Sequence, residues 1–323
     1  MSTKLIKIGV FGAGHLGKIH LKLLNESKKF NLLGFHDVNP DYSIKIEKEF
    51  GYKYFEDSNL LIESSDAIAI ITPTPSHFEI AMKCIEKNKH IFIEKPIAYS
   101  VDEAEEIVKF SKEKKIIGQV GHVERFNPAF NSINNMIGNP MFIESHRLSE
   151  FNPRGTDVSV VLDLMIHDID IILSLISSDI KNISSSGVSV ISNTPDIANA
   201  RIEFQNGAVA NLTSSRISLK NMRKLRFFQK ETYISVDLYN KKAEVVKMTD
   251  APKQLDQFAL TLENAEGKKK QIIYKNPKVV NNNAIQIELE NFANSINNGV
   301  KSIVSLEDAT RALKVAYSII NSM

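Results

Sequence analysis

The sequence predicts an α/β protein in which an N-terminal doubly wound parallel sheet is followed by a C-terminal α+β domain. Three observations predict this architecture. A glycine-rich turn at residues 12–17 joins an apolar strand to a helix, and strand and helix patterns then alternate as far as residue 120. Short β-rich runs extend from residue 183 to about residue 274 and give way to two helical patterns. We therefore expect two domains, over residues 1–122 and 123–323.

The glycine-rich turn has the spacing G-x-G-x-x-G and lies between the strand Leu5–Phe11 and a helix that begins at Lys18. In this pattern the first glycine permits a tight turn, the second lets a dinucleotide pyrophosphate approach the backbone, and the third lets the helix pack closely on the strand. The helix N-terminus offers free N–H groups and a partial positive charge to the phosphates. The residues predicted to bind the cofactor here are Gly12, Gly14, His15, Leu16 and Gly17. We therefore expect a Rossmann domain, although such glycines can also serve only as a turn.

A second strand, Asn31–His36, ends at Asp37, which lies 20 residues after Gly17. An acidic side chain at this distance is expected to accept hydrogen bonds from the adenosine ribose and to repel a 2′-phosphate. Asp37 therefore predicts NAD rather than NADP as the cofactor. The same residue also has the position that begins the turn Asp37–Pro40, and the two roles are compatible.

The remaining βα units follow the same pattern. Further strands are expected over 66–71, 90–93 and 116–120, with a helix over 40–50 and two more after Ser/Glu pairs that have capping-box spacing, Ser76 with Glu79 and Ser100 with Glu103. Because ligands of such sheets bind beyond the carboxyl ends of the strands, the residues there are expected to share one crevice. These residues are Gly12, Asp37, Thr72, Lys95 and Gly121.

After Gly121 the pattern becomes that of a second domain. A strand is expected over Met141–Phe151, a helix over Val160–Ile176, and helices over 284–296 and 306–321. Asn206-Gly207 is a strong hairpin signal between two of the β-rich runs. We expect one large, mostly antiparallel open sheet. Because few helices remain to cover it, a second subunit is expected on one face.

Two sets of residues could carry proton chemistry. Lys95, at the end of a parallel strand, could exchange a proton with a substrate hydroxyl near a positively charged nicotinamide, although a lysine in a turn is also an ordinary surface residue. Asp163, His167 and Asp170 fall within an arc of about 60° on an ideal α-helix, at about 100° per residue. A polar stripe on an otherwise apolar helix favours a cavity, where Asp163 could orient His167 as a general base or acid.

A third candidate is Arg154 in the loop 152–157, which could bind a phosphate or carboxylate of the substrate or be a plain surface residue. No metal site is predicted, because no further ligands cluster with the helix carboxylates. The net charge of +2 gives no reason to expect nucleic acid or a membrane surface as a partner. The sequence has a single cysteine, Cys84, and no apolar stretch long enough to cross a bilayer, and Lys4 and Lys7 interrupt its first apolar run. We therefore expect a soluble cytoplasmic protein.

These residues resemble the Gfo/Idh/MocA oxidoreductases, named for glucose–fructose oxidoreductase and inositol dehydrogenase. The resemblance rests on the glycine motif, Thr72-Pro73 followed by His77, Glu94-Lys95-Pro96, and Asp163-x-x-x-His167-x-x-Asp170. It implies NAD(P)-dependent hydride transfer at a sugar or cyclitol carbon and a C-terminal sheet used in homo-oligomers. It also implies that Lys95, Asp163 and His167 are catalytic, and that Thr72, Pro73, His77 and Glu94 line the nicotinamide half of the site.

Two stretches, 121–128 and 146–168, are similar to a narrower bacterial group in this family that oxidises the 3-hydroxyl of UDP-N-acetylglucosamine for 3-amino-sugar lipid A. This resemblance implies a nucleotide sugar as substrate, bound by Arg154, Asp163 and His167. Other nucleotide sugars, free sugars and inositol stay open as substrates, as does a nucleotide-sensing protein without turnover. Whether Lys95 or His167 is the general base also stays open.

Overall fold

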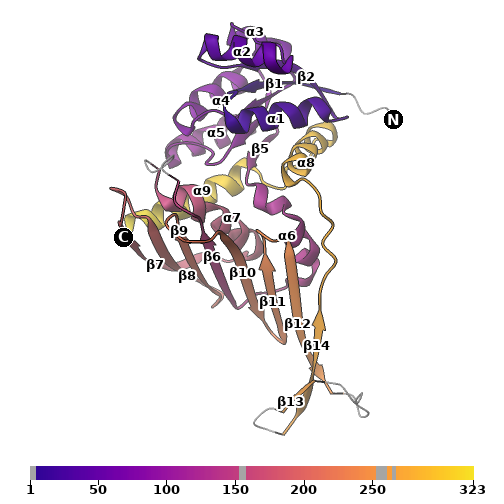
Figure 1. Cartoon of the computed structure of the whole chain (residues 1–323), viewed down its shortest axis with the longest axis vertical. Helices are drawn as coiled ribbons and strands as arrows, with labels where there is room; N and C mark the ends of the chain where they lie inside the picture. The colour runs from indigo at the N-terminus through magenta and orange to yellow at the C-terminus, as the bar shows by residue number, and fades with distance from the viewer. Residues whose placement is uncertain (1–4, 153–157, 252–259, 264–266) are drawn as a thin grey trace. The chain divides into compact units, whose positions relative to one another are not determined.

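The computed structural model describes residues 5–152, 158–251, 260–263 and 267–323 and contains two compact units (Figure 1). The first unit combines Met1–Phe126 with Asn283–Lys314, and the second combines Asn127–Asn282 with Val315–Met323. The predicted domain boundary after residue 122 stays a prediction. Residues 283–314, however, which the sequence grouped with the second domain, pack within the first unit. None of the helices in the described ranges is both long and apolar enough to span a bilayer.

The first unit contains a five-stranded sheet in the order β2-β1-β3-β4-β5, and every pairing in it is parallel. The strands are β1 (Ile6–Phe11), β2 (Phe30–His36), β3 (Ala67–Ile70), β4 (His90–Glu94) and β5 (Gly118–Gly121). The order reverses direction at β1, so β1 and β3 form the switch point at which such sheets bind ligands. The predicted doubly wound sheet is therefore confirmed.

The helices of this unit differ from expectation in three respects. The helices are α1 (His15–Glu26), α2 (Pro40–Phe50), α3 (Ser58–Ser64), α4 (His77–Glu86), α5 (Val101–Glu113) and α8 (Ala284–Asn298). Helix α1 begins three residues before Lys18, and α3 was not expected at all. The capping box at Ser100 is confirmed, but the one at Ser76 is wrong, because Ser76 ends the 3-10 turn Thr74–Ser76 with a helical instead of an extended backbone and its side chain makes no cap hydrogen bond.

Helix α8 completes the hydrophobic core of the first unit. Its Leu289, Phe292 and Ala293 are buried in one cluster with apolar residues of β1, α1 and β3. The Phe292 ring lies 6.0 Å from the Phe92 ring of β4. A helical pattern in the sequence shows which face of α8 is apolar but not which sheet that face covers, so its place in the first unit could not be predicted.

The second unit contains a nine-stranded sheet in the order β13-β14-β12-β11-β10-β6-β9-β8-β7. Its strands are β6 (Phe142–Leu148), β7 (Ile180–Val188), β8 (Ile197–Phe204), β9 (Val209–Ser215), β10 (Met222–Gln229), β11 (Thr232–Asp237), β12 (Lys242–Asp250), β13 (Thr261–Glu263) and β14 (Lys269–Lys275). Only β6 and β9 pair in parallel among these described strands, and Asn206-Gly207 turns β8 into β9. The predicted antiparallel open sheet is confirmed.

Two helices, α6 (Pro128–Ile133) and α7 (Ile166–Leu175), pack on this sheet (Figure 1). Helix α7 is fixed to β6 by a buried ion pair in which Arg147 Nη2 lies 2.6 Å from Asp168 Oδ1, and Ser145 Oγ donates to the same carboxylate at 2.7 Å. Helix α9 (Leu306–Asn321) continues from the first unit into the second.

A second buried carboxylate organises the connection between β7 and β8. Asp196 Oδ2 accepts the backbone N–H groups of residues 190–192 at 2.7–2.9 Å, and Arg216 Nε lies 3.8 Å from Oδ1. Burial by itself raises the pKa of Asp196, but the three hydrogen bonds outweigh it and hold the pKa below the ordinary range of a carboxyl group. The carboxylate therefore takes the place of a regular turn in holding this loop.

Candidate active site

The first unit contains a cavity of about 830 Å³ at the carboxyl ends of β1, β3 and β4. Its volume is in the range of ligand sites, which is about 300–1,000 Å³. Of the residues predicted to bind the cofactor, all but His77 line this cavity. They are Gly12, Gly14, His15, Leu16, Gly17, Asp37, Thr72, Pro73, Glu94 and Lys95. Four of the five residues expected to share one crevice, Gly12, Asp37, Thr72 and Lys95, thus line the same cavity, although they lie up to 83 residues apart in the sequence. The fifth, Gly121, is not among the lining residues.

The three glycines of the turn are needed for different structural reasons. Gly12 has a φ of +90°, and a Cβ on it would lie 2.6 Å from the Ile71 carbonyl oxygen. A Cβ on Gly17 would lie 2.2 Å from the Gly12 carbonyl oxygen, so α1 packs on the turn too closely for any side chain. A Cβ on Gly14, in contrast, would meet no protein atom within 4 Å. Protein packing therefore explains two of the glycines, and the open side of Gly14 is available to a ligand.

Asp37 uses one carboxylate oxygen to fix the glycine turn and the other to fix its own turn. Oδ2 accepts the Ala13 N–H at 2.8 Å, and Oδ1 accepts the Asn39 N–H at 3.1 Å. The second contact is the turn role that the sequence left open. Tyr42 donates its hydroxyl to the Ala13 carbonyl at 3.1 Å, so the backbone is held by hydrogen bonds on both sides of the Ala13 Cα. Because the carboxylate also lines the cavity, its negative charge is held at a defined position beside the turn.

His77 is buried and lies behind the cavity wall instead of lining it. Its Nδ1 lies 2.9 Å from the Pro96 carbonyl oxygen and its Nε2 2.8 Å from the Thr72 carbonyl oxygen. Burial lowers the pKa of His77, although both carbonyl contacts act in the opposite direction. The imidazole thus connects the segments that follow β3 and β4, and both segments contribute to the cavity.

Glu94 has a buried partner, His20, that the sequence analysis missed. Glu94 Oε1 lies 2.9 Å from His20 Nε2, and Oε2 accepts the Lys95 N–H at 3.2 Å. A Cβ on Gly121 would lie 2.8 Å from Oε2, so this glycine makes room for the carboxylate. The pattern of α1 could have indicated His20, since it falls on the same helix face as Gly17 and Leu24, both of which are buried.

The histidine that follows β5 is also close enough to Lys95 to be affected by its charge. His122 is buried, and burial, followed by the charges of Lys95 and Arg125, lowers its pKa to about 3. The His122 side chain is therefore neutral at physiological pH and adds no positive charge to the lysine end of the cavity.

In the second unit, the helix that carries Asp163 and His167 begins differently from expectation. Val161–Met165 form a π-helical turn, and the regular α-helix starts only at Ile166. The 60° arc assumed an α-helical rotation throughout, so it does not apply to Asp163. Both Asp163 and His167 are half-buried, whereas Asp170 is buried. Such π-turns recur at functional sites because they redirect side chains.

Asp163 and His167 are not among the residues that line the cavity of the first unit. Lys95 belongs to the first unit and Asp163 with His167 to the second, so their convergence on one substrate stays a prediction. Arg154 lies outside the described residues.

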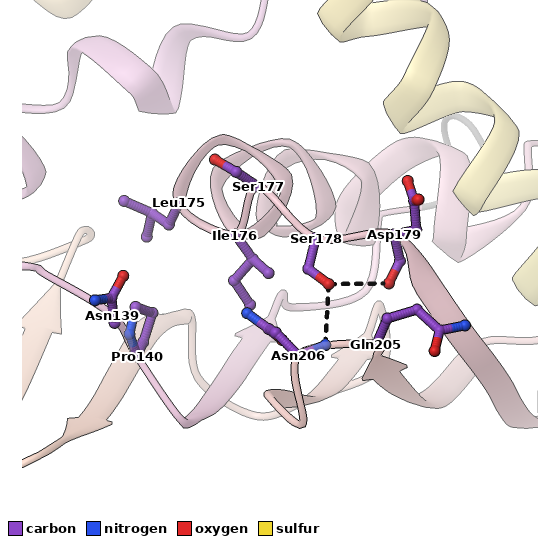
Figure 2. A pocket seen from close by; sticks show the side chains of 9 residues that line it. All are labelled: Asn139, Pro140, Leu175, Ile176, Ser177, Ser178, Asp179, Gln205 and Asn206. Carbon is purple, nitrogen blue, oxygen red and sulfur yellow. Dashed lines mark hydrogen bonds between the residues drawn. The ribbon is translucent and has the colours of Figure 1, made fainter.

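A second cavity, of about 520 Å³, lies in the second unit beside the end of α7 and the β8–β9 hairpin. Figure 2 shows its polar lining, in which the Asn206 N–H donates to Ser178 Oγ at 3.1 Å. None of the predicted site residues lines it. The cofactor prediction therefore concerns the first cavity alone.

The sequence matches two models of one family. Residues 6–122 match the oxidoreductase family with an NAD-binding Rossmann fold, GFO_IDH_MocA, and residues 131–234 match the GFO/IDH/MocA C-terminal domain. The chain is 33% identical to UDP-N-acetylglucosamine 3-dehydrogenase of Acidithiobacillus ferrooxidans, over 73% of this chain and 75% of that protein. It is 28% identical to scyllo-inositol 2-dehydrogenase (NAD(+)) of Bacillus subtilis, over 98% and 94% of the two chains.

The solved structures agree with these matches. A structure of the Acidithiobacillus ferrooxidans UDP-N-acetylglucosamine 3-dehydrogenase superposes with a TM-score of 0.88 at 26% identity, covering 99% of this chain and 98% of the other. The overall fold, including both sheets, is thus shared over nearly the whole of both chains. The chain therefore belongs to the Gfo/Idh/MocA family of oxidoreductases and is an NAD-type dehydrogenase.

Proposed function

We propose that this protein oxidises the 3-hydroxyl of UDP-N-acetylglucosamine to a ketone with NAD as the oxidant, and that the product is aminated for 3-amino-sugar lipid A. The observation that carries this proposal is the similarity to UDP-N-acetylglucosamine 3-dehydrogenase, which extends to 33% identity over 73% of the chain. It agrees with the likeness of the stretches 121–128 and 146–168 to the same bacterial group. The full-length similarity to an inositol dehydrogenase makes inositol the second candidate substrate.

NAD fits the first cavity for reasons that lie in the chain itself. The turn beside Gly14 is open, and the N-cap of α1 has no side-chain hydrogen bond among the described residues, so phosphates could accept the first N–H groups of the helix. The fixed negative charge of Asp37 favours a ribose with free hydroxyls over a 2′-phosphate. When bound, NAD would supply the acceptor for the hydride that leaves the sugar carbon.

The protein's part in the reaction is to remove the hydroxyl proton as the hydride leaves. Lys95 lines the cavity at the end of β4, on the same wall as Thr72 and Glu94. His167, half-buried and four residues after Asp163, is the alternative base. We assign the catalytic roles to Lys95, Asp163 and His167 and the binding of the substrate diphosphate to Arg154.

We further propose a homo-oligomer formed through the face of the second sheet that α6 and α7 leave uncovered. An apolar row crosses this face, and its members are cross-strand neighbours in register. The row consists of Val209, Phe142, Phe228, Tyr233, Val246 and Tyr274. Phe228 is 39% and Tyr274 54% exposed in the single chain, which favours burial against a second copy. Light scattering should show a dimer or tetramer that Phe228→Glu weakens and Tyr239→Glu, in a nearby turn, leaves intact.

The activity is tested by incubating the purified protein with NAD and, separately, UDP-N-acetylglucosamine, other UDP-sugars and scyllo-inositol. Formation of reduced cofactor with UDP-N-acetylglucosamine, and a product two hydrogens lighter by mass spectrometry, is the expected result. The mass measurement also detects turnover when the cofactor stays bound and is recycled. Oxidation of inositol alone would assign the second candidate, and binding of NAD without any product would support a nucleotide sensor instead.

A further inference from the structure

We propose that two buried histidines, His20 and His77, are positioning residues that hold Lys95 from both sides. His20 acts through the side chain of the residue before the lysine, and His77 acts through the carbonyl group of the residue after it. The inference rests on the proposed function, because it assumes that Lys95 exchanges a proton with the substrate.

His20 fixes Glu94 with a hydrogen bond of defined direction. Its side chain is fully buried, and among the described residues Nδ1 has no hydrogen-bond partner. A proton on Nδ1 would therefore be buried without an acceptor, which costs about 1–3 kcal/mol. The proton consequently lies on Nε2, which donates to Glu94 Oε1 at 2.9 Å.

Glu94 passes this constraint to Lys95. Its second oxygen accepts the Lys95 backbone N–H at 3.2 Å. The carboxylate has little freedom to move toward β5, because it lies directly over Gly121, where even a Cβ would be 2.8 Å from Oε2. His20, Glu94 and the Lys95 peptide thus form one hydrogen-bonded chain from α1 to the end of β4.

His77 fixes the segment on the other side of the lysine. It lies between the Pro96 and Thr72 carbonyl oxygens, 2.9 Å from one and 2.8 Å from the other. Burial favours the neutral imidazole, which carries one N–H, so the ring donates to one of these oxygens and fills the space beside the other. The buried ring thus keeps the residue after Lys95 at a set distance from the end of β3, and Thr72 and Lys95 both line the cavity. Lysine has a long and flexible side chain, so a fixed backbone on both sides limits where its ammonium group can lie.

The role of such residues is to keep a reacting group at the distance that the reaction needs. A misplacement of about 1 Å can cost about 100-fold in rate. We therefore expect His20→Leu and His77→Leu each to lower kcat by about 10- to 100-fold. His20→Gln, whose amide can donate to Glu94 from nearly the same place, should restore most of the loss.

The matched control is His90→Leu. His90 begins the same strand, β4, and its Nδ1 accepts the Ile117 N–H at 3.0 Å, but it lies at the opposite end of the strand from the cavity. This variant loses a histidine hydrogen bond and some thermal stability, and it should keep its kcat. All variants are compared at equal fractions folded, measured by circular dichroism.

A double-mutant cycle with Lys95→Met separates positioning from general structural damage. If His20 and His77 act through Lys95, adding His20→Leu or His77→Leu to Lys95→Met lowers kcat no further. Losses that multiply would overturn the inference, as would histidine variants that lose no more kcat than His90→Leu. If Lys95→Met itself turns over normally, the assigned role of Lys95 fails and the inference falls with it. If Lys95→Met loses activity while the histidine variants keep theirs, only the positioning role is refuted. If a leucine variant does not fold, His20→Gln still allows the test.

Discussion

Replacing Asp37 by serine should move the cofactor preference from NAD toward NADP. Two negative charges at a separation of about 6 Å repel each other by about 3 kcal/mol at an effective dielectric constant of about 20. Asp37 is half-buried in an open cleft, so screening by water and salt reduces this to about 1.4 kcal/mol. The ratio of kcat/KM for NADP to that for NAD should therefore rise about tenfold. Initial rates with both cofactors at saturating UDP-N-acetylglucosamine measure this ratio.

The same substitution also has a structural cost. It leaves the backbone N–H of the buried residue Ala13 without the carboxylate that accepts it, at about 1–3 kcal/mol of folding free energy, whereas the exposed Asn39 N–H can bond to water. Asp41→Asn is the matched control, because Asp41 is an exposed acid in the first turn of α2 that does not line the cavity. An unchanged cofactor ratio in Asp37→Ser, or an equal change in Asp41→Asn, would mean that Asp37 is only a turn residue.

Three further outcomes are expected. Lys95→Met and His167→Asn, made one at a time, should each lower kcat by about 100-fold or more while NAD binding measured by titration calorimetry is retained, and two fully active variants would refute the catalytic assignment. Arg147→Met should lower the free energy of unfolding in urea by about 3–5 kcal/mol because it leaves Asp168 buried and unpaired, and adding Asp168→Leu should recover much of that loss. Asp196 has a lowered pKa in the folded chain, so its contribution to stability is present above the ordinary carboxyl pKa and is lost as the pH falls below it. Urea unfolding of Asp196→Asn should accordingly depend less on pH between about 5 and 3 than that of the unmodified chain, and parallel pH profiles would contradict this.

Much of the cofactor domain could be predicted because its signals are local. The spacing of Gly12, Gly14 and Gly17 and the position of Asp37 are read directly from the chain, and the structure places these residues around one cavity. The turn that Asp37 begins was predicted from the sequence, but its hydrogen bond with the Ala13 N–H was not, because Ala13 belongs to a different βα unit.

The errors arise where tertiary contacts decide the local structure. Ser76 has the sequence of a helix cap, but the 3-10 turn before α4 gives it a helical backbone, which does not suit a capping residue. The π-turn before α7 could not be derived from periodicity, since both helix types present an apolar stripe. His20 was missed because its role depends on Glu94, which is 74 residues away in the sequence.

The place of α8 has a consequence for how this protein is made. The buried face of the cofactor unit includes Phe292, and Val120 in the last parallel strand donates its N–H to the Val304 carbonyl. During synthesis from the N-terminus, the glycine turn and all five parallel strands leave the ribosome well before these residues exist. The hydrophobic core of the first unit therefore stays incompletely buried while the whole second sheet is translated. A chain truncated after residue 282 should accordingly be more sensitive to protease in its first half than the full chain.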